Sequence, residues 1–175
     1  MEIRLYGTME DSIVDGPGMR YAVFAQGCPH GCIGCHNPES HSFEGGRLAD
    51  TAELVQVMKR NPLLDGLTLS GGEPFCQPEP CLELARAAHA LRLNVWAYTG
   101  YTWEQLHREN DPARIALLQE LDVLVDGPFV QAKKNLTLRF RGSENQRLID
   151  VPKSLETGTV VLWEDWQGNG RGLKA

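Results

Sequence analysis

The sequence predicts an α/β protein whose 175 residues form a single domain, 1–175. Short apolar segments alternate with longer amphipathic segments, a pattern typical of strands joined by crossover helices in a parallel sheet. A closed eightfold (β/α) barrel needs about 250 residues, so a barrel formed by this protein is expected to be open and partial. Residues 167–175 contain three glycines and are expected to form a flexible tail.

Strands are expected where short segments are rich in β-branched and aromatic residues. Helices are expected where apolar residues recur at helical spacing, as they do at Leu48, Ala52, Val55 and Met58. The Asn-Asp-Pro sequence that starts at position 110 is typical of a helix cap and first turn. The expected strands are residues 3–6, 21–26, 66–70, 93–98, 122–126, 147–151 and 159–163, and the expected helices are residues 48–60, 80–91 and 112–120.

The charge balance and hydropathy exclude some classes of protein. The sequence has 23 acidic and 17 basic residues and a net charge of −6, which disfavours binding to nucleic acid through its phosphates. No apolar run approaches the roughly 18 residues of a membrane span, and charges interrupt the first residues where a signal peptide would be apolar. We therefore expect a soluble cytoplasmic protein that binds neither nucleic acid nor membrane.

Three of the five cysteines, Cys28, Cys32 and Cys35, lie within eight residues, directly after an expected strand. Clustered cysteines in a reducing compartment are more often metal ligands than disulfides, and an odd count does not fit a closed disulfide framework. A zinc site completed by His30, His36 or a distant residue is one interpretation. An electron-carrying cluster would need a fourth thiolate, which Cys76 or Cys81 could supply. Alternatively, three thiolates hold a four-iron cluster and leave one iron open to a small molecule.

Two further segments place small residues at the end of an expected strand. Gly71-Gly72-Glu73-Pro74 follows the strand at residues 66–70, and Thr99 follows the strand at residues 93–98. Glycines without a Cβ allow backbone carbonyl and amide groups to approach a ligand closely. Alternatively, both segments are ordinary turns that contact no ligand. Glu73 would then be a carboxylate with a structural role.

The Cys-x3-Cys-x2-Cys loop resembles the signature of the radical S-adenosylmethionine (SAM) superfamily. The resemblance implies a [4Fe-4S] cluster on Cys28, Cys32 and Cys35, in which SAM chelates the iron that has no protein ligand. It implies no catalytic side chain beyond the cluster and SAM. It also implies that the fold is the open partial barrel of radical SAM type. Gly34 departs from the aromatic residue that often precedes the third cysteine of the superfamily. The residues that the resemblance assigns to SAM are Gly34, Cys35, His36, Gly71, Gly72, Glu73 and Thr99.

The segments at residues 14–20 and 35–38 resemble those of the glycyl-radical-enzyme activases. Residues 122–129 and 140–147 are similar to segments of the activases of anaerobic ribonucleoside-triphosphate reductases. The resemblance implies that the protein removes a hydrogen atom from a glycine of the large reductase subunit and receives its electron from a flavodoxin-type donor. The alternatives are a pyruvate formate-lyase type activase, a small-molecule radical SAM enzyme, and a non-enzymatic zinc or iron–sulfur interaction module.

Residues 131–153 differ in charge from the rest of the sequence. They contain six basic and two acidic residues and carry a net charge of +4. Complementary charge accelerates encounter and selects partners, so this stretch could dock on an acidic face of the reductase. The alternative is an ordinary solvated surface.

Overall fold

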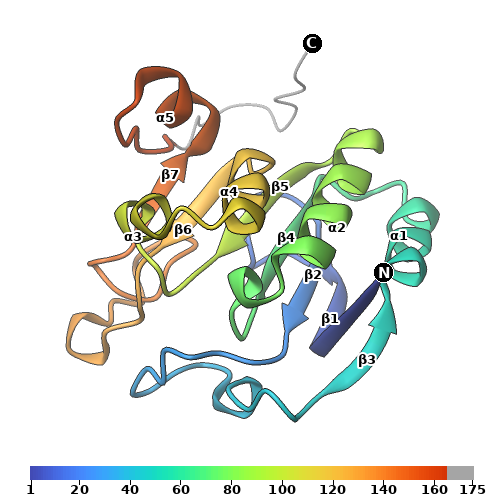
Figure 1. Ribbon diagram of the computed structural model, residues 1–175, viewed down its shortest axis with the longest axis horizontal. Coiled ribbons are helices and arrows are strands. Elements are labelled where there is room, and N and C mark those ends of the chain that lie inside the picture. Colours follow the sequence, from blue (N-terminus) through green and yellow to red (C-terminus); the bar gives the residue numbers. More distant parts are fainter. Residues whose placement is uncertain (165–175) are drawn as a thin grey trace.

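The computed structural model describes residues 1–164, and within them one mixed seven-stranded sheet is combined with five α-helices (Figure 1). The predicted α/β class is confirmed, and the expected tail at residues 167–175 lies outside the described residues. None of the helices in this described part is long and apolar enough to cross a membrane. The strands are β1 (Glu2–Ser12), β2 (Arg20–Ala25), β3 (Arg47–Asp50), β4 (Gly66–Gly71), β5 (Asn94–Tyr98), β6 (Val123–Asp126) and β7 (Arg147–Asp150), and the helices are α1 (Thr51–Arg60), α2 (Pro78–Ala90), α3 (Trp103–Glu109), α4 (Pro112–Gln119) and α5 (Val151–Thr157).

The sheet has the order β3-β1-β2-β4-β5-β6-β7, and its four central strands, β2, β4, β5 and β6, are parallel. β1, β3 and β7 run antiparallel to their neighbours, so the expectation of a parallel sheet is wrong at both edges. Parallel strands need a crossover connection of about a dozen residues or more. Only residues 13–19 join β1 to β2, and this length allows antiparallel pairing but no crossover.

The helix expected at residues 48–60 is divided between a strand and a helix. Leu48 lies in β3 and pairs with Arg4 of β1, so it does not belong to the helix face on which it was placed. α1 starts after Asp50, whose carboxylate caps it by accepting a hydrogen bond from the amide of Ala52 at 2.9 Å. The buried face of α1 contains Leu54 and Met58, whereas Ala52 is exposed.

Other boundaries also differ from the prediction. α2 begins two residues earlier than expected, while α4 begins after the Asp111 cap as predicted. α3 and α5 were not predicted, although Thr102 and Gln105 form a capping box that the sequence contains. Residues 159–163 were expected to form a strand, but their contact with the sheet is an isolated bridge between Ile149 and Leu162.

The two faces of the sheet are packed differently. Helices α1, α2 and α4 cover one face (Figure 1), where Leu54, Leu84 and Leu118 join the main apolar core. Because side chains alternate along a strand, Trp96 and Val125 point to the opposite face and form a second apolar cluster there. The helix-covered face therefore contains most of the core, and the opposite face is left to line the cavity described below.

A buried arginine joins the parallel strands on the face that Trp96 occupies. The guanidinium of Arg20 donates hydrogen bonds to Thr68 Oγ1 at 2.6 Å, to the Leu67 carbonyl at 2.7 Å and to Asn94 Oδ1 at 2.8 Å. It also lies 5.4 Å from the centroid of the Trp96 ring. Burial lowers the pKa of Arg20 to about 10, a value at which the guanidinium is still charged at neutral pH. The arginine thus fastens β2 to β4 and β5.

We predict that Arg20→Lys lowers the free energy of unfolding by about 3 kcal/mol, measured by urea denaturation. A lysine keeps the charge but lacks the planar fork that serves several acceptors at once, and each lost hydrogen bond to a charged group contributes about 1.5–3 kcal/mol. Arg47→Lys, at an exposed position of β3, is the control and should change stability by less than about 0.5 kcal/mol. Equal stability of the two variants would contradict the prediction.

Candidate functional site

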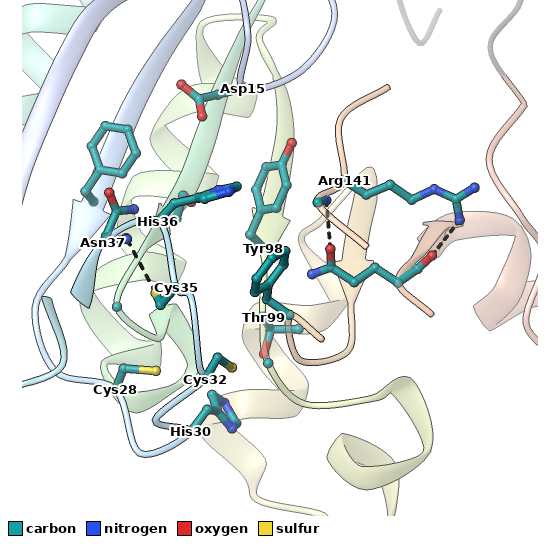
Figure 2. A pocket seen from close by; sticks show the side chains of 18 of the residues that line it. Asp15, Cys28, His30, Cys32, Cys35, His36, Asn37, Tyr98, Thr99 and Arg141 are labelled. Carbon is teal, nitrogen blue, oxygen red and sulfur yellow. Dashed lines mark hydrogen bonds between the residues drawn. The ribbon is translucent and has the colours of Figure 1, made fainter. Parts of the chain in front are cut away.

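A cavity of about 640 Å³ lies at the carboxyl ends of the parallel strands (Figure 2). Its walls come from the end of β1 and the loop after it, the loop after β2, the turn after β4, the ends of β5 and β6, and residues 138–146. In Figure 1 the loop after β2 (blue) and the segment after β6 (orange) lie along the same lower edge of the sheet. In open α/β sheets this edge is where ligands bind, because the strand ends and their loops meet there.

The cysteine loop, which we define as residues 27–38, begins just after β2 and is held closed by backbone hydrogen bonds. The amide of Gly27 donates to the carbonyl of Ser40 at 2.8 Å, and the amide of Cys28 donates to the carbonyl of His41 at 3.0 Å. Gly31 and Gly34 have φ angles of +58° and +74°, a region that favours glycine. These bonds and turns fold the loop back on itself, so its cysteines face the same space.

Cys28, Cys32 and Cys35 are all partly exposed, and all three line the cavity (Figure 2). The amide of Asn37 donates a hydrogen bond to Sγ of Cys35 at 3.4 Å. Burial raises the pKa of the Cys28 thiol to about 11, and the negative charge of Glu73 adds to this effect. A bound cation would oppose this shift, because metal coordination favours the thiolate.

The three thiols fit the demands of an iron–sulfur cluster. In residues 1–164 no group of three or more His, Cys, Asp and Glu residues is placed to hold a single metal ion. A four-iron cluster makes a different demand, because separate irons take separate thiolates and the sulfur atoms need not converge. Three cysteines on one loop, with an amide donor to the Cys35 sulfur, match that donor set. They would leave one of the four irons without a ligand from this loop.

Gly71 and Gly72 allow the turn after β4 to lie directly against the base of the cysteine loop. The amide of Gly72 donates to the carbonyl of Ala25 at 2.7 Å, and the amide of Glu73 donates to the carbonyl of Gly27 at 2.8 Å. A Cβ at position 72 would lie 2.5 Å from the Gly27 carbonyl oxygen, and one at position 71 would lie 2.6 Å from the Ala25 nitrogen. The glycines therefore serve a close contact within the protein, and both also line the cavity.

Glu73 is fully buried and connects three segments of the site. Its carboxylate accepts hydrogen bonds from the Thr99 hydroxyl at 2.9 Å and from the amide of Gly100 at 2.9 Å, and it lies 2.7 Å from Nε2 of His30. It also caps its own turn by accepting from the amide of Phe75. The partners of its carboxylate in the structure are thus protein groups, and the assignment of Glu73 to SAM stays a prediction.

Gly34 lies outside the cavity lining, and neighbouring residues take up the space around it. A Cβ at position 34 would lie 3.1 Å from the Gln131 amide carbon and 3.4 Å from the Phe129 ring. Phe129 also contacts the imidazole of His36, with 5.4 Å between ring centroids, and both rings line the cavity. Many members of the superfamily have an aromatic residue at the position of Gly34. In this protein the ring of Phe129 lies beside that position.

Three more cavity residues were not identified as site residues from the sequence: Asp15, Tyr98 and Arg141 (Figure 2). Asp15 belongs to an Asp-Gly-Pro turn, and Tyr98 immediately precedes Thr99. Burial raises the pKa of Tyr98, and the charge of Asp15 adds to this. The sequence contained these motifs, but it had no signal that Ser12–Asp15 and residues 138–146 reach the same cavity.

The remaining cysteines lie elsewhere in the described residues. Cys76 is part of a short 3₁₀ turn after Glu73, and Cys81 is buried in α2 within the main core. Neither is among the residues that line the cavity. Burial raises the pKa of both thiols.

Comparison with known proteins defines the class of protein to which this fold and site belong. A family model described as a 4Fe-4S single cluster domain matches residues 14–149, a span that includes the cysteine loop, Glu73 and Thr99. The site is thus that of an iron–sulfur protein with one cluster domain.

Curated relatives narrow this class to one family. Three relatives, all named anaerobic ribonucleoside-triphosphate reductase-activating protein, match 77% of this chain each. The relative from Haemophilus influenzae is 36% identical over 144 residues, and the match covers 89% of its length. The relative from Escherichia coli K12 is 34% identical over 145 residues, and the match covers 90% of its length. The relative from Enterobacteria phage T4 is 32% identical over 144 residues, and the match covers 86% of its length. The chain belongs to the family of anaerobic ribonucleoside-triphosphate reductase-activating proteins, as the resemblance in the sequence predicted.

We predict that Gly72→Ala lowers the free energy of unfolding by about 1–3 kcal/mol, because the new methyl group would overlap the Gly27 carbonyl oxygen. Gly7→Ala is the matched control, since a Cβ at position 7 meets nothing within 4 Å. Its effect should stay within about 0.5 kcal/mol. Thermal or urea denaturation measures both, and a Gly72→Ala protein as stable as Gly7→Ala would contradict the prediction.

Proposed function

We propose that the protein is a radical SAM activase that generates the glycyl radical of an anaerobic ribonucleoside-triphosphate reductase. The observation that carries this proposal is that Cys28, Cys32 and Cys35 share one cavity with Gly71, Gly72 and Thr99. The names of the relatives support the choice of the reductase as the protein substrate. A cavity of about 640 Å³ is within the range of small-molecule sites, which span about 300–1,000 Å³.

In this proposal the three thiolates hold a [4Fe-4S] cluster, and the cavity wall positions SAM. When bound, the cluster supplies one electron to SAM, whose sulfonium–carbon bond breaks to give methionine and a 5′-deoxyadenosyl radical. The SAM amino group is a hydrogen-bond donor, so we assign to it the carbonyls of Gly71 and Gly72, two residues that line the cavity.

The remaining residues of the cavity wall shield and orient the reacting groups. Thr99 and the backbone of Cys35 and His36 border the methionine and ribose end of SAM in this proposal. The proposal also assigns the backbone of Gly34 and Glu73 to SAM, because these residues are next in sequence to the cavity-lining Cys35 and Gly72. Little acid–base machinery is required, because the cofactors carry the difficult step and the protein supplies position and shielding.

We infer that the fold is an open, partial (β/α) barrel of radical SAM type and that the described residues 1–164 belong to one such domain. Supporting this, helices cover one face of the parallel strands and the cavity lies on the other side, at their carboxyl ends. A partial barrel leaves a wide lateral entrance through which a glycine segment of the reductase can reach the cavity. A flavodoxin-type donor is the electron source in this proposal.

The decisive experiment mixes the protein, reconstituted with iron and sulfide, with a candidate reductase, SAM and reductant in the absence of oxygen. Electron paramagnetic resonance should show a glycyl doublet on the reductase. SAM cleavage without any such signal would instead favour a small-molecule radical SAM enzyme, and a pyruvate formate-lyase partner tests the related activase class. Zinc in place of iron, or a cluster whose spectrum ignores SAM, would overturn the proposal.

We predict that Cys28→Ala, Cys32→Ala and Cys35→Ala each abolish dithionite-dependent SAM cleavage, because each removes one of the three cluster ligands. Cys76→Ala is the control, since Cys76 lies outside the cavity lining, and it should keep both cleavage and iron content. Iron and sulfide analysis together with 5′-deoxyadenosine measurement by chromatography provides the readout. Full cleavage by any of the first three variants would refute the ligand assignment.

We predict that Lys133→Glu with Lys134→Glu weakens binding to the reductase by about tenfold or more at low salt, while SAM cleavage is retained. Both lysines are exposed beside Gln131 and Leu136, on the segment that follows the cavity-lining Phe129. Lys59→Glu with Arg60→Glu is the control, because these exposed residues end α1 on the helix-covered face. The affinity for the reductase, measured by surface plasmon resonance, should fall only in the Lys133/Lys134 variant. Equal affinities of the two variants would contradict the prediction that residues 131–153 dock on the reductase.

A further inference from the structure

The pair formed by Glu73 and His30 has a position that the proposed SAM chemistry does not explain. Glu73 has no exposed surface, yet it is a carboxylate, and burying such a group is costly unless donors satisfy it. Its Oε1 atom accepts from Thr99 and Phe75, and its Oε2 atom lies within hydrogen-bond distance of His30 Nε2 and the Gly100 amide. The carboxylate is therefore satisfied only when the cysteine loop and the turn after β5 are both in place.

His30 is the part of the cysteine loop that this carboxylate holds. It lies between Cys28 and Cys32 in the sequence, and its side chain is only 16% exposed (Figure 2). The ring packs edge-on against Tyr101, with 4.5 Å between centroids and an interplanar angle of 76°. A Cβ at Gly100 would lie 2.3 Å from the ring, so the backbone at this position is shaped to admit the imidazole.

We propose that Glu73 and His30 form a hydrogen-bonded clamp that holds the cysteine loop in its cluster-binding shape and that Glu73 sets the reduction potential of the cluster bound there. Glu73 is a positioning residue in this proposal, since it acts on the cluster through the loop and through its charge. The proposal rests on the [4Fe-4S] part of the proposed function and does not depend on SAM or on the reductase.

The effect on the potential follows from charge. A fixed negative charge close to a cluster disfavours the addition of an electron, and net charge, hydrogen bonding and burial are the factors by which a protein sets cluster potentials. Glu73 lies close to the start of the cysteine loop, because its amide donates a hydrogen bond to the carbonyl of Gly27, the residue before Cys28, at 2.8 Å. Glu73→Gln removes this negative charge, so the midpoint potential of the cluster should rise. His30→Gln removes the ring without adding positive charge, so it should not raise the potential.

A second histidine–carboxylate pair in the same protein provides a matched control for this clamp. His89 and Asp122 form it, with 3.0 Å between Nε2 and Oδ2. Asp122 immediately precedes β6, so it lies at the amino end of that strand, whereas the cysteine loop lies at the carboxyl edge of the sheet. Asp122→Asn therefore removes a carboxylate of the same kind far from the cluster.

The first test is a dye-mediated redox titration of the reconstituted full-length protein, followed by electron paramagnetic resonance. We expect a positive shift of the cluster midpoint potential in Glu73→Gln, no positive shift in His30→Gln, and the wild-type value in Asp122→Asn. An unchanged potential in Glu73→Gln, or an equal shift in Asp122→Asn, would overturn the assignment. A wild-type protein that forms no four-iron spectrum would count against the proposed function and not against the clamp.

The second test needs no cluster and stays informative if one variant folds poorly. In the cluster-free full-length protein, the rate of alkylation of Cys28 and Cys32 by iodoacetamide is followed by mass spectrometry, with the wild-type protein labelled under the same conditions as the reference. Loss of the clamp in His30→Gln or Glu73→Gln should speed labelling of the loop thiols about tenfold relative to Asp122→Asn, the change expected when one hydrogen bond to a charged group is lost. Equal labelling rates in all three variants would refute the clamp.

Discussion

The architecture of this site depends on one buried carboxylate. Glu73 has no contact with solvent, so its oxygens need protein donors, and these come from the loop after β2, the turn after β4 and the turn after β5. No one of these segments could satisfy the charge alone. Folding therefore brings the three segments together at one strand edge, and the cavity with its three thiols forms where they meet.

Close contact between backbone segments makes this arrangement possible. Gly72 lies against the Gly27 carbonyl and Gly100 lies against the His30 ring, at distances where a Cβ would overlap its neighbour. The glycines thus have a packing role as well as any role toward a ligand. A loop that is held this firmly at its base can present its thiols without first paying the full cost of ordering, which is the usual advantage of a preorganised site.

The sheet supplies the rigid frame on which this edge is built. Helices bury one face in a continuous apolar core, while the other face carries Trp96, Tyr98 and the buried guanidinium of Arg20. Arg20 connects three parallel strands through Thr68, Leu67 and Asn94, and these bonds lie toward the amino ends of the strands. The protein combines this rigid frame with a cavity between loops, and the relatives in its family are named as activating proteins of anaerobic ribonucleoside-triphosphate reductase.

The sequence by itself determined the α/β class, the parallel central strands, the cysteine spacing and the family, because these follow from local periodicity and short motifs. It did not determine the antiparallel edges: Leu48 has helical spacing, yet it pairs in β3 with a strand more than forty residues away. Nor could it show that Glu73 turns toward His30 and Thr99, or that Asp15 and Arg141 share the cavity. Those contacts join residues far apart in the sequence, and only the tertiary structure decides them, because they depend on strand order, burial and the direction in which each residue leaves its strand or loop.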